Sequence, residues 1–282
     1  MKSTTRALAR FLYRRTLSPG AKSALRHWLA LEEPDRPPMA IENFTESRVL
    51  VLAPHMDDET IGCGGTIRRH VLGGGRVAVA FLTDGRKGNR ELRGEGDAGT
   101  SLPRDVAQRV LEKTRIEEAR RAAAILGIAE LFFLGGEDGA LEASAAMVER
   151  VTALLAKERP EVVYVPSMLD LHSDHWAANC ILDRAALALD VAERTWTCRE
   201  FEVWTPLFPN RAVDIGDVVD AKRQALEQYV SQLATTDYVR TTLGLNTYRS
   251  IYLSGGRGYA EALFESAPEE FARLHQRLRK RQ

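Results

Sequence analysis

The sequence predicts an α/β fold in which a mostly parallel sheet carries helices on both faces. Short, almost continuously apolar runs alternate with longer helical patterns from residue 48 onward. Strands that are apolar along their whole length are typical of a parallel sheet buried on both sides. The chain has 282 residues, of which 44% are hydrophobic and 28% charged, which is ordinary for a globular protein. We therefore expect one large domain over residues 39–282, preceded by an extension over residues 1–38.

The extension over residues 1–38 is basic. Its first thirty residues carry no acidic side chain, and apolar residues such as Leu8 and Phe11 are scattered among the basic ones. A secretory signal needs an unbroken apolar stretch, which this pattern lacks. We expect a helix that packs on the main domain or on a partner subunit. In the second case the protein would be a homo-oligomer. A basic amphipathic helix could instead lie on an anionic membrane surface. The run Pro34–Pro38 indicates a linker.

The elements of the first half follow from apolar runs and their boundaries. The run at 48–53 predicts a buried strand, and the helical pattern after it ends at three consecutive glycines. A polar, glycine-rich stretch at 86–103 indicates a loop, and the Ala-, Glu- and Arg-rich stretch after it favours a helix. The predicted strands are 48–53 and 76–83, and the predicted helices are 59–72 and 105–126.

The second half continues the alternation and then departs from it. Strands are predicted at 131–134, 161–165 and 200–204, and helices at 143–157, 174–188, 218–232 and from 269 onward. The stretch 243–262 is rich in glycine and tyrosine and predicts no regular element. The repeated order of strand and helix up to residue 188 indicates that the strands run parallel.

Charge and cysteine content exclude several classes of protein. The 39 basic and 39 acidic residues give a formal net charge of zero, which argues against a nucleic-acid-binding protein. The sequence contains no run of 18 apolar residues, so a membrane-spanning helix is not expected. The three cysteines, Cys63, Cys180 and Cys198, are far apart, so neither a disulfide framework nor a thiolate zinc site is expected. A reducing cytoplasm suits this composition.

Two clusters of histidine and aspartate follow the predicted strands 48–53 and 161–165. The first contains His55, Asp57 and Asp58, and the second contains His172, Asp174 and His175. In open parallel sheets, ligands bind beyond the carboxyl ends of the strands, where both clusters fall. A catalytic zinc ion takes about three nitrogen or oxygen ligands, which two histidines and one carboxylate supply. A remaining carboxylate can take a proton from water, whose pKa zinc lowers.

The remaining histidines have no such cluster. We expect His27, His70 and His275 to be surface or packing residues. The glycine-rich run Gly62–Gly65 lacks the GxGxxG order of a dinucleotide-binding loop, so tight backbone packing is the preferred interpretation.

The two clusters, with their flanking residues, resemble the PIG-L/LmbE-like family of N-acetylglucosaminyl deacetylases. The resemblance rests on Pro54-His55-Met56-Asp57-Asp58-Glu59 and His172-Ser173-Asp174-His175, and extends through Thr83-Asp84-Gly85, Asp138-Gly139 and Glu202-Val203-Trp204. It covers roughly residues 48–265 and implies a Rossmann-like sheet and one catalytic domain. Met56, Arg86 and Tyr229 depart from the family pattern, which puts a role for Tyr229 in the site in doubt.

The resemblance implies a role for each residue of the two clusters. His55, Asp58 and His175 are implied as zinc ligands, although the same donors can hold other divalent metals. Asp57 is implied as the general base. His172 is implied as the acid or electrophilic partner, with Asp174 orienting it. Adjacent carboxylates on an extended turn are expected to point in different directions, which agrees with separate roles for Asp57 and Asp58.

Three further residues are candidates for the site. Arg86 follows the predicted strand 76–83 and could contact a substrate hydroxyl or lie in solvent. Trp204 is expected to be an aromatic residue of the core, with stacking on a sugar face as the alternative. Glu59 could support the metal ligands from behind or merely begin a helix.

The expected function is zinc-dependent hydrolysis of the N-acetyl amide of an N-acetylglucosamine-type sugar, carried by a glycoside, glycolipid precursor or polysaccharide intermediate. An amidase that cleaves an amino-sugar thiol conjugate uses the same machinery and is one alternative. A non-catalytic metal- or sugar-binding protein is another, but such a protein need not retain both Asp57 and His172.

Overall fold

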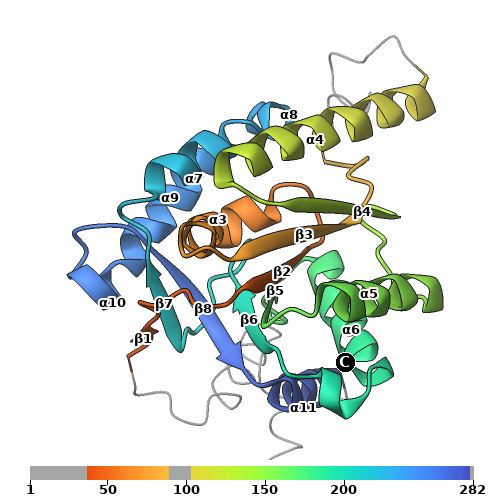
Figure 1. Cartoon of the computed structure of the whole chain (residues 1–282). Helices are drawn as coiled ribbons and strands as arrows, with labels where there is room; N and C mark the ends of the chain where they lie inside the picture. Colours follow the sequence, from red (N-terminus) through yellow and green to blue (C-terminus); the bar gives the residue numbers. More distant parts are fainter. Residues whose placement is uncertain (1–36, 89–102, 280–282) are drawn as a thin grey trace, which may run out of the picture. The chain divides into compact units, whose positions relative to one another are not determined.

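The computed structural model describes residues 37–88 and 103–279, and one compact unit, Pro37–His275, contains the whole sheet (Figure 1). Eight strands form this sheet in the order β1-β7-β8-β6-β5-β2-β3-β4. They are β1 (Met39–Ala40), β2 (Arg48–Ala53), β3 (Arg76–Thr83), β4 (Glu130–Gly136), β5 (Val162–Pro166), β6 (Thr197–Phe201), β7 (Arg211–Asp214) and β8 (Ala260–Ser266).

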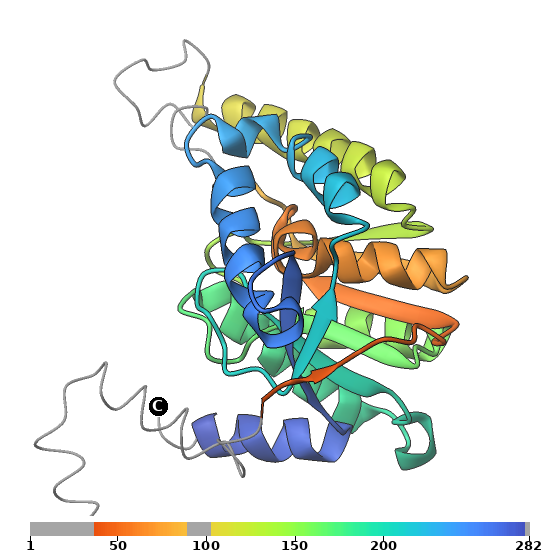
Figure 2. The ribbon, with the colours of Figure 1, turned by 90° about the vertical axis from the view of Figure 1, so that its left-hand side faces the viewer.

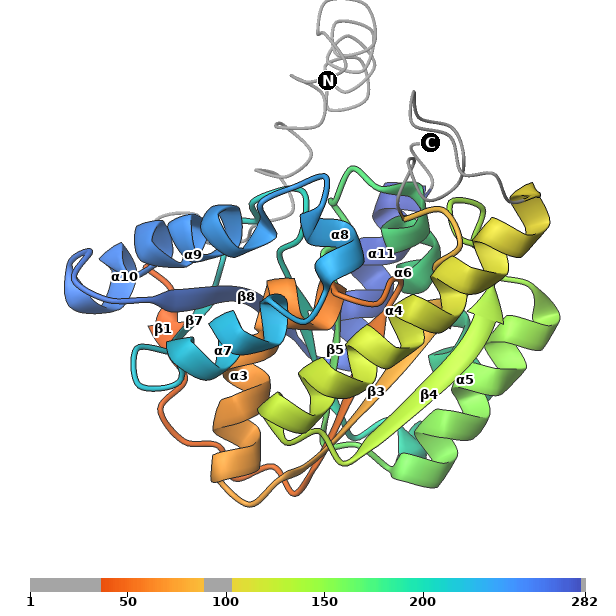
Figure 3. The same ribbon diagram turned by 90° about the horizontal axis from the view of Figure 1, so that it is seen from above.

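Helices cover both faces of the sheet. Helices α3, α4, α7 and α9 pack on one another on one face, and α5 and α6 pack together on the other (Figures 1 and 3). The helices are α3 (Asp58–Leu72), α4 (Arg104–Leu126), α5 (Ala145–Glu158), α6 (Ser173–Ala188), α7 (Val219–Leu226), α8 (Val230–Leu233), α9 (Tyr238–Arg249), α10 (Ile251–Ser254) and α11 (Pro268–Arg279). Within residues 37–88 and 103–279, no helix combines the length and apolar character of a membrane span.

The expected mostly parallel α/β sheet is confirmed. Only β8 runs antiparallel to its neighbours β6 and β7, and it lies inside the β1 and β7 strands on the side of the sheet that faces the viewer in Figure 2. The chain builds β2, β3 and β4 outward in one direction and then returns to place β5 on the other side of β2, with Val49 opposite Val162. Such a reversal of strand order opens a crevice at the carboxyl ends of the two central strands. His55 follows β2 at this crevice, and His172 follows β5.

Helix α3 is divided by a kink at Cys63, whose φ of −143° and ψ of 24° are not helical. The kink frees backbone N–H groups of the second half. The carboxylate of Glu261 on β8 accepts from the N–H groups of Gly65 (2.8 Å) and Thr66 (2.7 Å). Lys222 on α7 donates to Glu261 (2.6 Å) and to the carbonyl oxygen of Ile61 (2.9 Å). This buried ion pair therefore joins both halves of α3 to α7 and β8.

Close packing explains the glycines of this kink. A Cβ atom on Gly62 would stand 2.1 Å from the ring of Phe201, and one on Gly65 would stand 2.6 Å from Ile215. Both contacts are far too short for a side chain. The packing interpretation of Gly62–Gly65 is confirmed.

Most predicted elements occur within a residue or two of their expected bounds, but the C-terminal third differs. The predicted strand 200–204 ends at Phe201, because Glu202 turns inward to pair with buried Arg249. The predicted helix 218–232 breaks between α7 and α8, where Tyr229 enters the core. The stretch 243–262, for which no element was expected, contributes to α9, α10 and β8. The predicted N-terminal helix and most of the loop at 86–103 lie outside the described residues, and the boundary at residue 38 stays a prediction.

Two of the isolated histidines are packing residues. His70 is buried, with its Nε2 2.9 Å from the hydroxyl of Tyr164. His275 is buried, with its Nδ1 2.9 Å from Asp183 and its Nε2 3.3 Å from the sulfur of Cys180. His27 lies outside the described residues.

We expect Glu261→Gln to lower the free energy of unfolding by about 3–5 kcal/mol, because it leaves the Lys222 ammonium buried without a counter-charge. The double variant Glu261→Gln/Lys222→Met removes both charges and should recover part of this loss. Urea unfolding of the two single variants and the double variant gives the coupling free energy of the pair. Additive losses would show that the pair is not coupled.

His275 should make the stability depend on pH. Burial alone would lower its pKa, but hydrogen bonds to Asp183 and Cys180 raise it from 6.5 to about 9. The stabilisation is therefore fully present below pH 6.5 and is lost as the pH rises through 9. We expect the free energy of unfolding of the wild-type protein to be about 2 kcal/mol higher than that of the Asp183→Asn variant at pH 6. The difference should be smaller at pH 9.5. A difference that stays constant across this range would contradict the assignment.

Candidate metal and catalytic site

The first cluster lies on the turn between β2 and α3. The carbonyl oxygen of Pro54, which precedes the turn, accepts hydrogen bonds from the N–H (3.0 Å) and the hydroxyl (2.8 Å) of Thr83 at the end of β3. His55 follows within the turn, and Asp58 begins α3. The N–H of His55 donates to the Asp58 carboxylate at 2.8 Å. The end of the neighbouring strand therefore fixes where both side chains enter the crevice.

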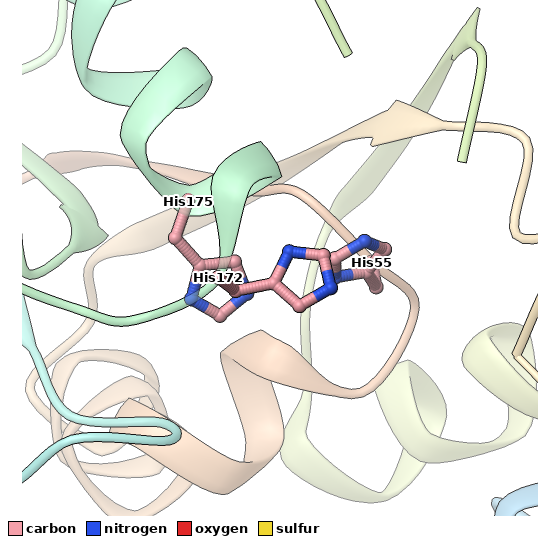
Figure 4. A group of neighbouring side chains, drawn as sticks. All are labelled: His55, His172 and His175. Carbon is pink, nitrogen blue, oxygen red and sulfur yellow. The ribbon is translucent and has the colours of Figure 1, made fainter. Parts of the chain in front are cut away.

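The second cluster lies at the start of α6. His172 is the N-cap residue of this helix, and its Nδ1 accepts from the N–H of Asp174 at 3.1 Å. His175 follows in the first turn and is fully buried. Figure 4 shows the rings of His172 and His175 at the start of α6 beside the ring of His55. The ring centroids of His55 and His172 are 4.7 Å apart, and those of His172 and His175 are 5.0 Å apart.

Asp58 connects the two clusters through a single oxygen atom. Its Oδ2 lies 3.1 Å from Nδ1 of His55 and 3.3 Å from Nε2 of His175. The second nitrogen of each ring faces another carboxylate: Nε2 of His55 lies 3.0 Å from Asp174, and Nδ1 of His175 lies 3.3 Å from Asp170. A carboxylate behind a histidine is the usual support of a metal-ligating imidazole.

The charges of this cluster shift the pKa values of its members strongly. Burial opposes ionisation of Asp58, but the adjacent His175 and His55 hold its pKa well below the usual range. Burial likewise lowers the pKa of His55, yet Asp58 and Asp174 outweigh it and raise the value to about 10. The same balance raises the pKa of His175 to about 9. The carboxylates of the cluster therefore favour positive charge at the position of the two rings.

The donors present fit a divalent metal such as zinc. Nitrogen and oxygen ligands stand about 2.0–2.2 Å from zinc, so two that share a tetrahedral ion are roughly 3.3 Å apart. The distances from Asp58 to His55 and His175 match this spacing. Within the described residues, neither ring nitrogen of His175 has an aligned hydrogen-bond partner. Such unsatisfied buried nitrogens are suited to ligate a metal.

Two other sets of donors compete with this one. Ligand atoms of His55, His172 and His175 all lie within 4.8 Å of one another, and so do those of His55, Asp138 and Asp174. The three-histidine set shares two members with the predicted set and replaces Asp58 by His172.

Asp57 has a different environment from Asp58, as adjacent carboxylates on a turn were expected to have. Its backbone adopts φ 149° and ψ −25°, a conformation that costs a residue other than glycine energy. Arg115 on α4 holds it, donating to the carbonyl oxygen of Met56 at 2.6 Å and lying 3.2 Å from the Asp57 carboxylate. Burial raises the pKa of Asp57 to about 7, although the charge of Arg115 opposes the shift.

Glu59 supports the same turn from behind. It is buried, and its carboxylate accepts hydrogen bonds from the N–H of Asp57 (3.2 Å) and from the hydroxyl of Tyr229 (2.6 Å). Tyr229, where the family pattern is interrupted, therefore stabilises the turn through Glu59 rather than through a direct contact with the metal cluster.

The structure places Asp174 differently from the expected arrangement. Its carboxylate accepts from the N–H groups of Gly139 (2.7 Å) and Leu141 (3.1 Å) and contacts His55. Only its backbone N–H reaches His172, because His172 caps the helix in which Asp174 occupies the first turn. Asp174 thus orients His172 through the backbone and His55 through the carboxylate.

The two candidate substrate-binding residues differ in whether their side chains are available to a substrate. Arg86 donates from Nε (2.9 Å) and from one Nη (2.7 Å) to Glu112, so its guanidinium is already partnered. Trp204 is 52% exposed and lies 6.0 Å from the ring of Tyr238, centroid to centroid. The expected core position of Trp204 is wrong, because the chain leaves the sheet at Phe201 and Trp204 lies beyond it.

Sequence reasoning missed three charged residues of the site. Arg115 lies mid-helix, where nothing in the local pattern separates it from the surface arginines of α4, and only its burial reveals it. Asp170 stands two residues before His172, and Asp138 lies 3.5 Å from His55. Two features of the sequence could have identified the aspartates. Asp138 belongs to the family motif Asp138-Gly139, and Asp170 lies close to the second cluster.

Comparison with known proteins identifies the family. Residues 50–186 match the family model described as PIG-L, GlcNAc-PI de-N-acetylase. A deacetylase of 1D-myo-inositol 2-acetamido-2-deoxy-alpha-D-glucopyranoside from Mycobacteroides abscessus is 32% identical over 69% of this chain and 84% of its own length. Diacetylchitobiose deacetylase from Thermococcus kodakarensis is 29% identical over 77% of this chain and 82% of its own.

The fold agrees with this assignment. The solved structure of N,N'-diacetylchitobiose deacetylase from Pyrococcus horikoshii superposes with a TM-score of 0.67, covering 90% of this chain and 96% of its own, at 20% sequence identity. The chain belongs to the PIG-L family of de-N-acetylases, and the resemblance found in its motifs is confirmed.

Proposed function

We propose that this protein removes the acetyl group from an N-acetylglucosamine-type sugar in a zinc-dependent hydrolysis that yields the free amino sugar and acetate. The observation that carries the proposal is the separation of two adjacent carboxylates. Asp58 lies between His55 and His175, while Asp57 contacts Arg115 instead. Family relatives named as deacetylases of acetamido sugars support the substrate class.

His55, Asp58 and His175 would hold the metal. Asp58 is preferred over His172 as the third ligand because its Oδ2 contacts both other donors. A zinc ion held there would polarise the amide carbonyl and lower the pKa of water. Asp174 and Asp170 would keep each imidazole in the required orientation.

Asp57 acts as the general base of the proposed reaction. It takes a proton from the attacking water while the oxygen of that water bonds to the amide carbon. The carbon–nitrogen bond then breaks, and the departing nitrogen takes the proton from Asp57. The products are the amine and acetic acid, which releases its proton to become acetate, and Asp57 returns to its starting state. A pKa near 7 suits a group that both accepts and releases this proton.

His172 stabilises the oxygen of the tetrahedral intermediate. Burial lowers the pKa of His172, and the charges of His55 and His175 lower it further, so the neutral ring is favoured over the imidazolium. Because Nδ1 accepts a hydrogen bond from the backbone, the neutral ring carries its proton on Nε2. That N–H can donate to a developing oxyanion, which is one of the two roles expected of His172.

We expect Asp57→Asn to lower kcat for N-acetylglucosamine by at least about a hundredfold while the protein keeps its metal, because the amide cannot accept the proton. Amine release and metal content are measured on the same preparation. Glu137→Gln removes an exposed carboxylate nearby and serves as the control that should keep full activity. Unchanged turnover in Asp57→Asn would overturn the assignment of the base.

Metal analysis distinguishes the two sets of ligands. We expect Asp58→Asn and His175→Gln to lose bound zinc on dialysis against a weak chelator, whereas His172→Gln retains zinc and loses activity. Elemental analysis of the three variants beside wild type gives the zinc content per chain. Loss of zinc from His172→Gln with retention in Asp58→Asn would show that the three histidines hold the metal instead.

A further inference from the structure

A cysteine, a histidine and an aspartate lie together outside the metal cluster, where the first part of α11 meets α6 (Figure 1). Cys180 and Asp183 are one turn apart on α6, and His275 reaches them from α11. Nε2 of His275 is 3.3 Å from the sulfur of Cys180, and Nδ1 is 2.9 Å from Oδ2 of Asp183. The contribution of His275 to stability explains the aspartate, but it does not explain the sulfur at the other nitrogen.

The surroundings of His275 hold its ring in this orientation. Trp176, one turn before Cys180 on α6, packs with its ring centroid 4.9 Å from that of His275, and Phe271 stacks on His275 at 6.3 Å with an interplanar angle of 6°. Among the described residues, Oδ1 of Asp183 has no hydrogen-bond partner, so the buried carboxylate contacts His275 through Oδ2 alone. Asp183 therefore orients one nitrogen of the ring and leaves the other directed at the sulfur.

The ring presents a positive charge to the sulfur. Burial alone would lower the pKa of His275, but the hydrogen bonds to Asp183 and Cys180 raise it to about 9, so the ring is protonated at neutral pH. An imidazolium donates from both nitrogens, and the sulfur of Cys180 is the acceptor at Nε2. A sulfur beside a histidine that a carboxylate orients is the arrangement by which enzymes activate a cysteine nucleophile.

Cys180 differs in accessibility from the other two cysteines of the sequence. Cys63 and Cys198 are fully buried, and burial raises the pKa of each of their thiols well above the usual range. Cys180 is half-buried. A half-buried sulfur between two helices admits a small reagent more readily than a bulky disulfide. A small oxidant therefore suits this position, and the two buried thiols serve as internal references.

We infer that Cys180 is a peroxide-reactive thiol, activated by His275 and positioned through Asp183. The sulfur bonds to one oxygen of hydrogen peroxide, and the oxygen–oxygen bond breaks. The departing oxygen takes a proton from Nε2 of His275, which the thiol proton replaces, and it leaves as water. The thiol is thereby oxidised to a sulfenic acid while the peroxide is reduced. This reaction uses no group of the metal cluster, so it is independent of the proposed deacetylation.

Trapping of the sulfenic acid tests the inference on the full-length wild-type protein. The protein is treated with hydrogen peroxide at neutral pH in the presence of dimedone, which bonds to sulfenic acids, and the labelled peptides are quantified by mass spectrometry. We expect the label on Cys180 and not on Cys63 or Cys198, forming about tenfold faster than on N-acetylcysteine under the same conditions. A rate no higher than that of N-acetylcysteine would overturn the inference.

Two variants distinguish activation from simple exposure. We expect His275→Gln and Asp183→Asn each to lower the labelling rate of Cys180 about tenfold, because the sulfur loses its oriented imidazolium. Loosened packing would act in the opposite direction, since it exposes the sulfur further. Glu269→Gln removes an exposed carboxylate of α11 and should leave the rate unchanged. Equal or faster labelling in both His275→Gln and Asp183→Asn would overturn the role of the triad.

Two further readouts keep the test decisive. Should a variant unfold, Cys63 and Cys198 acquire the label as well, and the comparison of wild type with N-acetylcysteine then decides alone. Iodoacetamide labels accessible thiols without oxidation. Rapid alkylation of Cys180 by iodoacetamide without any reaction with peroxide would show a nucleophile of another specificity and would contradict the assignment of the oxidant.

Discussion

The buried ion pair of Glu261 and Lys222 is the interaction on which the arrangement of this molecule depends. A kink at Cys63 exposes backbone N–H groups inside the protein, and such groups are costly unless they find an acceptor. Glu261 supplies that acceptor, and Lys222 balances its charge while binding the carbonyl oxygen of Ile61. The pair thereby holds the first half of α3, which begins with Asp58.

The proposed chemistry depends on giving two neighbouring carboxylates opposite environments. Asp58 stays ionised between two imidazoles, whereas burial raises the pKa of Asp57. The unusual backbone of Asp57 makes this separation possible, because it turns one side chain toward the histidines and the other toward Arg115. Supporting contacts from Glu59 and Arg115 hold a conformation that the turn would not adopt by itself.

Local pattern predicted the parallel half of the sheet well and the C-terminal third poorly. Strands β2 and β3 carry their signal in their own apolar residues, so their bounds agree with the prediction. Strand β8 has no such signal, because its apolar run is interrupted by buried Glu261, which contacts α3. The division between α7 and α8 likewise depends on Tyr229 reaching Glu59 across 170 positions of sequence. Contacts between residues that are distant in the sequence produce no periodic pattern of apolar residues.

The sequence by itself determined the class of fold, the two clusters at the carboxyl ends of the strands and the family to which the chain belongs. Short motifs carry this information because chemistry requires particular side chains at particular spacings. Only the tertiary structure decided what surrounds them: Asp170 behind His175, Asp174 behind His55, and Arg115 beside Asp57. Burial and charge pairing between distant segments exist only once the chain has folded, so a local pattern cannot specify them.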